Sequence, residues 1–276
     1  MSSVALSVER QKPPALLQAE REAWQMLAES RCGTYFAEGR FHILEAQIRL
    51  RMKALGQRSS RDYLHLASAD TAAGRAEWKQ LLPLILNGDT AFFRHRDSFD
   101  ALSSMVLPTL LREPEKAQIA IWCAGCSTGE EAYSIAAVAL SHGLEQAAVR
   151  ILGTDVNEAA LAIARQGIYD RSGIPDDVRG RSLRQISRAR LQQVISFASC
   201  NLMHPETYPQ QQDLIWCQNV LIYCRDSCRS RIVAGFEESL RPGGYLLLSP
   251  VDAMCVRPAH LEPVQAGHVR LYKKAR

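Results

Sequence analysis

The chain has 276 residues, a length at which two domains, or one large domain with an appendage, are expected. With 47% hydrophobic and 22% charged residues, its composition excludes disordered, collagen-like and coiled-coil proteins. A formal net charge of +4 is too small to indicate strong binding to the phosphate backbone of nucleic acids. The N-terminus lacks the apolar stretch of a secretory signal and no apolar run reaches membrane-span length, so a cytoplasmic protein is expected.

Apolar residues recur at three- and four-residue spacing from residue 16 to residue 86. This spacing predicts a small all-helical domain, preceded by a flexible N-terminus over residues 1–15. Within it, the helix expected at 41–55 carries Arg49, Arg51 and Lys53, and Glu45 is its only acid. Such a basic face is either a solvated helix surface or a docking surface for an acidic partner.

After residue 113 the pattern changes to short apolar strands that alternate with helices. This alternation predicts an α/β domain over residues 114–276, with a mostly parallel sheet covered on both faces and ligands at the carboxyl ends of its strands. Residues 87–113 are expected to link the two domains, and an arginine-rich stretch at about 169–195 to leave the sheet. The expected strands are 119–123, 149–155, 194–198, 213–223, 245–248 and 269–272, the last closing an edge, and the expected helices are 130–140, 158–166 and 226–240.

The first two strands of this sheet end in residues suited to a nucleoside. A glycine-bearing turn, 124–129, follows the first strand, and Glu130 and Glu131 open the next helix, where they would repel a pyrophosphate. Asp155, which lies 26 residues after Gly129, can accept hydrogen bonds from both ribose hydroxyls or can simply cap a helix. Together these features favour a ribonucleoside with a positive centre, S-adenosylmethionine, over a nicotinamide dinucleotide.

Two other segments carry polar residues that can face the same crevice. Arg94 directly follows a pair of phenylalanines, and an arginine suits bidentate recognition of a carboxylate, although a surface ion pair is the simpler interpretation. Asn219 and Tyr223 end the fourth expected strand. Each can hold a ligand or serve as a core residue with a satisfied polar group.

The chain resembles the CheR-type family of chemotaxis-receptor glutamate O-methyltransferases over most of its length. The resemblance rests on T-A-F-F-R at 90–94, W-C-A-G-C-S-T-G-E-E-A-Y-S-I-A at 122–136, T-D-V-N at 154–157, N-V-L-I-Y at 219–223 and L-R-P-G-G-Y-L at 240–246. It implies a Rossmann-like S-adenosylmethionine-dependent methyltransferase sheet with a small N-terminal helical domain. The implied reaction moves the sulfonium methyl to glutamate carboxylates of a methyl-accepting chemoreceptor in chemosensory adaptation and leaves S-adenosylhomocysteine.

The resemblance also implies roles for the matching positions. Arg94 and Tyr223 would lie nearest the methyl and the incoming carboxylate, as the catalytic residues, and the segment 87–113 would contact the cofactor. The face with Arg49, Arg51 and Lys53 would dock on the cytoplasmic helical region of the receptor. No metal ligand is implied, and a glutamate that is already ionised at neutral pH needs no general base. The implied cofactor-binding residues are Thr90, Arg94, Ala124, Glu131, Asp155, Asn201, Leu202, Asn219 and Val220.

The chain departs from the family pattern at three positions. Gly88 stands where the family has Asn, with Asn87 one residue earlier, Gln218 replaces an Arg, and Asp252 stands in place of a Glu. These departures leave a second function open, a catalytically weak S-adenosylmethionine-binding scaffold in a chemosensory or motility pathway. The excursion at 169–195 is shorter than in members that bind the receptor's C-terminal tethering peptide, so no strong binding of that peptide is expected. A nucleic-acid or small-molecule methyltransferase is disfavoured because no N-P-P-Y motif is present.

The eight cysteines can be buried filler, metal ligands or redox thiols in a reducing compartment. Cys123 and Cys126 form a C-x-x-C pair, but they occupy small-residue positions of the expected cofactor loop. This placement favours apolar filler, with Cys123, Cys126 and Cys217 close to the cofactor crevice.

Overall fold

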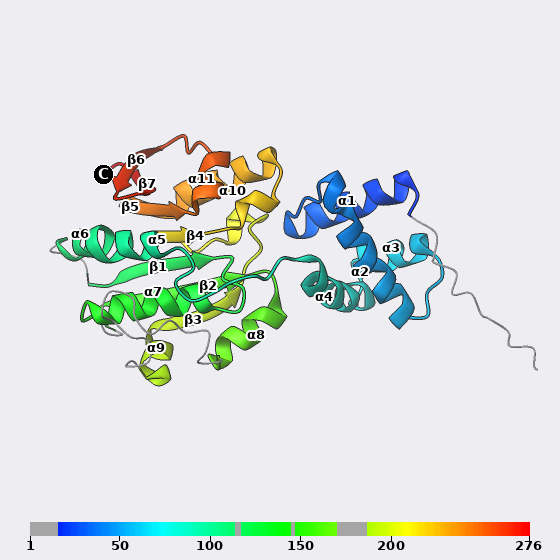
Figure 1. The fold of residues 1–276 in the computed structure, drawn as a ribbon, viewed down its shortest axis with the longest axis horizontal. Coiled ribbons are helices and arrows are strands. Elements are labelled where there is room, and N and C mark those ends of the chain that lie inside the picture. Colours follow the sequence, from blue (N-terminus) through cyan, green and yellow to red (C-terminus); the bar gives the residue numbers. More distant parts are fainter. Residues whose placement is uncertain (1–15, 114–116, 145–146, 170–186) are drawn as a thin grey trace, which may run out of the picture.

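The computed structural model describes residues 16–113, 117–144, 147–169 and 187–276. A helical segment lies beside an α/β segment built around a single sheet (Figure 1). This architecture confirms the predicted fold class. The expected flexible N-terminus and most of the arginine-rich excursion lie outside the described residues, and of the excursion only Tyr169 and residues 187–195 are described.

The helical segment has its own apolar core, to which each helix contributes one face. Trp24, Leu44, Ile48, Tyr63 and Leu81 are at most 1% exposed there. The third and fourth helices begin at Ser and Thr side chains that accept backbone N–H groups, as good N-caps do. The helices are α1 (Gln18–Cys32), the short 3-10 turn η1 (Glu38–Arg40), α2 (Phe41–Ala54), α3 (Ser60–Ser68) and α4 (Ala72–Ile85).

A buried ion pair ties α2 to α3 and α4. The Arg51 guanidinium donates from Nε and Nη2 to the two carboxylate oxygens of Glu77, at 2.8 and 2.7 Å, and the Tyr63 hydroxyl donates to the same carboxylate at 2.8 Å. Burial alone would raise the pKa of Glu77, but the hydrogen bonds from Arg51 and Tyr63 hold it below its ordinary value. The charge on Glu77 is therefore kept, and three helices are joined through one carboxylate.

The α/β segment contains a seven-stranded sheet in the order β3-β2-β1-β4-β5-β7-β6. The first five strands are parallel and β7 runs antiparallel to both of its neighbours. Every residue of β1 and β4 is buried, as expected for central strands covered on both faces. The strands are β1 (Ile119–Ala124), β2 (Val149–Asp155), β3 (Ile195–Ser199), β4 (Gln212–Cys217), β5 (Leu240–Leu248), β6 (Leu261–Ala266) and β7 (Val269–Lys274).

The prediction for the edge of the sheet is wrong. The stretch 269–272 lies in β7, which is inserted between β5 and β6, so β6 forms the edge. The chain turns back through Gly267, whose φ of +59° suits glycine, and pairs β6 with β7 along their whole length. The sequence of β6 hides it, because the strand contains Pro263 and only Leu261 is buried.

Helices cover both faces of the sheet. Alternate residues of β1 point to opposite faces, so that Ile121 packs in the core beneath α5 to α9 and Trp122 in the core beneath α10. The expected linker is itself largely helical, because α5, a π-helical turn at 102–106 and α6 follow one another. The helices are α5 (Arg96–Ala101), α6 (Leu107–Leu111), α7 (Glu130–Ser141), α8 (Glu158–Gln166), α9 (Arg188–Val194), α10 (Asp226–Ser239) and α11 (Pro250–Cys255). Among the described residues, no helix has the length and apolar character needed to cross a membrane.

Replacing Glu77 by alanine is expected to lower the free energy of unfolding by about 3 kcal/mol, because the largely buried Arg51 guanidinium loses its counter-ion. Urea denaturation followed by circular dichroism measures the loss. Glu22→Ala, at an exposed position of α1, serves as the control and is expected to change stability by less than about 0.5 kcal/mol. Equal stability of the two variants would show that the ion pair does not hold the three helices together.

Candidate functional site

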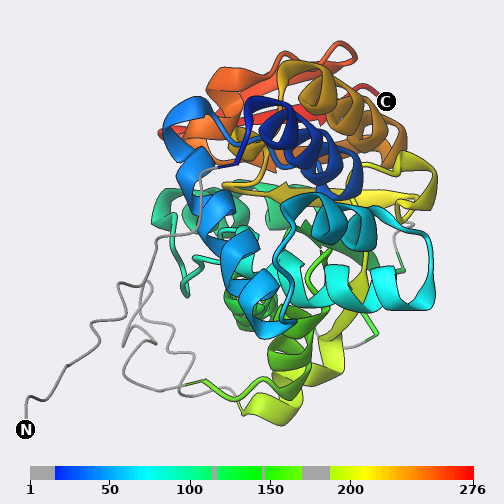
Figure 2. The same ribbon diagram turned by 90° about the vertical axis from the view of Figure 1, so that its right-hand side faces the viewer.

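A cleft lies at the carboxyl ends of the parallel strands, on the side where the helical segment meets the sheet. Seen from that side, helices α1 to α4 stand in front of the sheet (Figure 2). The cleft holds about 1120 Å³ of space, counted out to its open mouth. It is lined by some residues of the stretches 32–40 and 85–94 and by the turns that follow β1, β2, β3 and β4. This is the edge at which open α/β sheets bind nucleotides.

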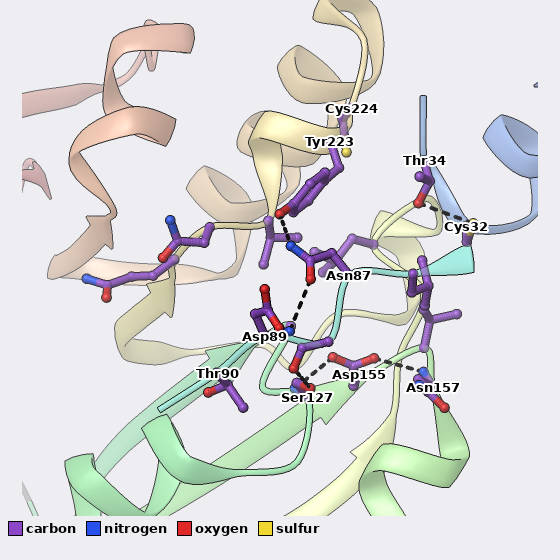
Figure 3. Close-up of a pocket in the computed structure, with 18 of the residues that line it drawn as sticks. Cys32, Thr34, Asn87, Asp89, Thr90, Ser127, Asp155, Asn157, Tyr223 and Cys224 are labelled. Atoms are coloured by element: carbon purple, nitrogen blue, oxygen red, sulfur yellow. Dashed lines mark hydrogen bonds between the residues drawn. The ribbon is translucent and has the colours of Figure 1, made fainter. Parts of the chain in front are cut away.

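The turn after β1 and the end of β2 are held together by Asp155 (Figure 3). Its carboxylate accepts the backbone N–H of Ser127 and that of Asn157, both at 2.8 Å. Each carboxylate oxygen keeps another lone pair, so Asp155 can still accept two ribose hydroxyls. Gly125 lines the cleft with φ of +74°, and a Cβ there would lie 2.5 Å from Val220, so only glycine lets these two walls approach.

Three buried polar atoms on residues that line the cleft make no hydrogen bond of normal geometry within the described residues, although the Trp216 indole acts on the Glu131 carboxyl as a donor. They are Thr90 Oγ1, Glu131 Oε1 and Gln218 Oε1, which come from three different elements. Unpartnered buried polar atoms are rare in folded proteins because each costs free energy. Two acceptor oxygens beside a hydroxyl suit an ammonium group, so these residues fit the amino-acid end of S-adenosylmethionine.

The electrostatics of the cleft centre on Glu131, which is 5% exposed. Burial raises the pKa of Glu131 to about 8, against the lowering effect of the Arg94 charge. Without a bound cation, this carboxyl is mostly protonated at neutral pH. Burial also raises the pKa of Asp155, although hydrogen bonds from backbone N–H groups oppose that shift.

A strained turn brings Thr90 and Arg94 to the cleft. Phe93 has a φ of +53°, which is costly for a bulky side chain, and it is held there by a bond from its N–H to Ser134 Oγ and by packing on Phe99. Arg94 Nη1 donates to the backbone oxygen of Asp89 at 2.7 Å. The guanidinium is thus fixed at the cleft while most of its N–H groups stay available.

The loop after β4 differs from the sequence prediction. The strand ends at Cys217, because Asn219 adopts φ of +57° and residues 221–223 form a 3-10 turn. Asp252, which is fully buried, holds this loop by accepting the N–H of Ile222 at 2.9 Å and the hydroxyl of Ser249 at 2.7 Å. Asp252, which stands at the position of the family's glutamate, therefore fixes the conformation of the loop that lines the cleft.

Tyr223, at the end of this loop, is held by three parts of the chain. Asn87 donates from its side-chain amide to the Tyr223 hydroxyl at 2.5 Å (Figure 3), and the N–H of Tyr35 donates to the Tyr223 backbone oxygen at 2.7 Å. The guanidinium of Arg40 lies 5.3 Å from the centre of the Tyr223 ring. The displaced Asn87 thus reaches the cleft even though Gly88 occupies the family's position.

The structure brings nearly all of the expected cofactor residues together. Ala124 is the exception, because its side chain is 1% exposed and packs in the core, and its neighbour Gly125 lines the cleft instead. Asn201 lines the cleft, yet its amide is occupied, since it donates to the Arg31 backbone oxygen and accepts the N–H of Met203. The expected residues that line the cleft are Thr90, Arg94, Glu131, Asp155, Asn201, Leu202, Asn219, Val220 and Tyr223.

The expected docking residues lie away from the cleft, on α2. Arg49 pairs with Glu45, Arg51 is committed to Glu77, and Lys53 is exposed. Two of the three positive charges are therefore balanced by neighbouring carboxylates, and their role in docking stays a prediction.

Cys123, Cys126 and Cys217 are buried filler, as expected, but they do not line the cleft. They lie in the sheet cores, where burial raises the pKa of each thiol well above its ordinary value, whereas Cys32, Cys200 and Cys224 line the cleft. All eight cysteines are free, and no group of three or more metal-ligating side chains occurs within the described ranges.

Two groups of residues that line the cleft are absent from the predicted cofactor site. Ser127 and Asn157 belong to the motifs at 122–136 and 154–157, and their backbone N–H groups contact Asp155. Residues 34–36 and Arg40 come from the helical segment and reach the cleft only through tertiary packing.

Affinity for S-adenosylhomocysteine is expected to depend on pH through Glu131. Because an ammonium partner favours the charged carboxylate, binding releases a proton below the free pKa of about 8. Affinity should therefore rise by up to about tenfold per pH unit as pH approaches 8, and level off above it. Isothermal titration between about pH 6 and pH 8.5 measures this slope.

Glu131→Gln is expected to abolish the slope, and Glu130→Gln to preserve it. Glu130 is the matched control because it stands next in sequence but does not line the cleft. A pH-independent affinity of the unaltered protein would show that Glu131 does not hold the cofactor's ammonium group.

Comparison with known proteins gives matches over most of the chain. Residues 88–269 match the family model described as CheR methyltransferase, SAM binding domain. The chain is 30% identical over 233 residues to a chemotaxis protein methyltransferase of Borreliella burgdorferi, which covers 78% of this chain and 81% of that protein. It is 25% identical over 271 residues to the chemotaxis protein methyltransferase Cher2 of Pseudomonas putida, which covers 91% and 96%. Because the family model spans more than half of the chain, the chain belongs to the CheR methyltransferase family.

Proposed function

We propose that this protein transfers the methyl group of S-adenosylmethionine to glutamate side chains of a methyl-accepting chemoreceptor, in the cytoplasm, as part of chemosensory adaptation. The observation that carries the proposal is that Thr90, Glu131 and Gln218, each with a buried polar atom that lacks a hydrogen bond of normal geometry, line the same cleft as Asp155. Relatives over most of the chain are named chemotaxis protein methyltransferases, which supports a receptor as the substrate. We assign residues 16–86 as a helical domain, 87–113 as a cofactor-contacting linker and 114–276 as the methyltransferase domain.

The proposed roles of the cleft residues follow from their chemistry. S-adenosylmethionine supplies an electrophilic methyl group on a sulfonium. Asp155 would accept the ribose hydroxyls, and Glu131 with Gln218 would accept the ammonium group. Leu202 and Val220 offer apolar surface in the same cleft, which suits the adenine and the thioether portion.

For the receptor carboxylate, the task of the protein is alignment. A glutamate with a pKa of about 4.3 is ionised at neutral pH, so no side chain has to remove a proton. Holding two reactants in line can supply several kcal/mol of the barrier reduction. Arg94 would guide the carboxylate and Tyr223 would fix its geometry, which agrees with the position of both side chains on the cleft.

The helical segment is the proposed contact with the receptor's helical region. Lys53 and the partly exposed Arg49 would meet acidic side chains of the receptor, whereas Arg51 has a structural role through Glu77. Because surface charges mainly steer association, this contact should weaken with rising salt concentration. Strong binding of the receptor's C-terminal tethering peptide is not part of the proposed function.

The scaffold alternative rests on the departures at Gly88, Gln218 and Asp252. Asp252 makes the hydrogen bonds that hold the loop after β4, and Gln218 directs an unpartnered oxygen to the cleft. Asn87 lines the cleft beside Gly88. The polar groups of the cleft are therefore present, which favours an active enzyme.

Transfer of tritium from methyl-labelled S-adenosylmethionine to the cytoplasmic fragment of a chemoreceptor tests the function. A glutamate methyl ester is expected, so mild alkali should release the label as methanol. Cofactor binding without any transfer would support the scaffold, and the absence of S-adenosylhomocysteine binding would exclude both functions.

Arg94→Ala is expected to lower kcat/KM for the receptor by at least about 100-fold, because an oriented cation is lost from the reaction site. Binding of S-adenosylhomocysteine should remain measurable by titration. Arg96→Ala, which removes an equal charge at an exposed position two residues later, is expected to retain near-normal turnover. Near-normal turnover of the Arg94 variant would remove Arg94 from the reaction site.

A further inference from the structure

Arg40 lies at the cleft although it belongs to the helical segment. It ends the 3-10 turn η1, just before α2, and its side chain is exposed and lines the cleft. Its guanidinium carbon lies 5.3 Å from the centre of the Tyr223 ring, within the range of a cation–π contact. A side chain of the helical segment thus touches the aromatic ring that the proposed function places at the reacting carboxylate.

Arg40 forms no ion pair with an acidic side chain within the described parts of the chain. Arg49 and Arg51, by contrast, pair with Glu45 and Glu77. Arg94, the other basic residue that lines the cleft, donates to the Asp89 backbone oxygen, and its charge acts on Glu131. Of the two arginines that line the cleft, Arg40 is therefore the one whose guanidinium is less engaged by the protein and more available to a ligand.

The geometry of the contact leaves hydrogen-bond donors free. No described residue accepts a hydrogen bond from the Arg40 side chain, so the five N–H donors of its guanidinium stay available beside the Tyr223 ring. The Tyr223 oxygen accepts a hydrogen bond from Asn87 at 2.5 Å, so the phenolic hydrogen is free to be donated to another group. Arg40 and Tyr223 together present donors, a positive charge and no free acceptor other than one phenolic lone pair.

We propose that Arg40 is a substrate-binding residue, which receives the carboxylate of the target glutamate jointly with the Tyr223 hydroxyl at the entrance of the cleft. The inference rests on the proposed function and names a residue outside the methyltransferase domain. A carboxylate matches this set of donors, whereas the side chain of glutamine lacks the charge and would leave one donor opposite an amide NH₂ group. The pair would therefore also select glutamate over glutamine.

The test compares receptor methylation by the unaltered protein with that by Arg40→Gln and Arg40→Lys. Arg40→Gln is expected to lower kcat/KM for the receptor by about 10- to 100-fold, mainly through KM, and to change S-adenosylhomocysteine affinity by less than about twofold. Arg40→Lys should recover only part of the loss, because an ammonium keeps the charge but lacks the planar fork that binds a carboxylate in bidentate fashion. Arg61→Ala, an exposed charge removal on α3, controls for long-range steering and should stay within about twofold.

A double-mutant cycle with Tyr223→Phe tests whether the two side chains bind the same group. The two losses are expected to be strongly non-additive, because each single change disrupts one shared carboxylate site. Additive losses, an unchanged Arg40→Gln enzyme, or a loss shared by Arg61→Ala would overturn the inference while leaving the proposed function intact. A fall in cofactor affinity or thermal midpoint in Arg40→Gln would show a structural role and overturn it as well. If the unaltered protein methylates no receptor, the proposed function fails, and this inference fails with it.

Discussion

The cleft depends on how the end of helix α1 is fastened to the loops of the sheet. Asn201 donates to the Arg31 backbone oxygen at 2.7 Å, which satisfies one of the carbonyls that a helix end leaves open. Gly33 follows, with φ of +74°, and a Cβ there would lie 2.7 Å from the sulfur of Met203. This approach needs glycine, and it sets the position of residues 34–40 over the strand ends.

Most polar groups of the cleft are hydrogen-bonded within the protein. They satisfy one another, as Asp155 does with two backbone N–H groups and Asn87 with Tyr223. The exceptions are buried atoms of Thr90, Glu131 and Gln218, residues that line the same cleft. Burial of these polar groups without hydrogen bonds costs free energy before a ligand binds. A ligand of complementary charge removes this cost when it binds.

Residues at strand ends were predictable from the sequence because the architecture itself places them. Once the first two strands are parallel neighbours, the turn before Glu131 and the acid at Asp155 must meet at one edge. The prediction places Ala124 at the cleft, whereas Gly125 lines it. This error of one residue arises because strand periodicity is a poor guide to side-chain direction near a turn. Arg40 could not be predicted, since neither its neighbours nor its spacing shows that η1 packs against Tyr223.

The walls of the cleft come from two segments that otherwise have separate cores. Between them run a few polar contacts, among them the ion pair of Glu29 with Arg225 and the stacking of Arg225 on Tyr35 at 4.2 Å. A ligand that touches both walls adds its binding free energy to this seam. Binding of the cofactor in this cleft is therefore expected to stabilise the two segments against separation, so that the chain unfolds more cooperatively with the cofactor than without it.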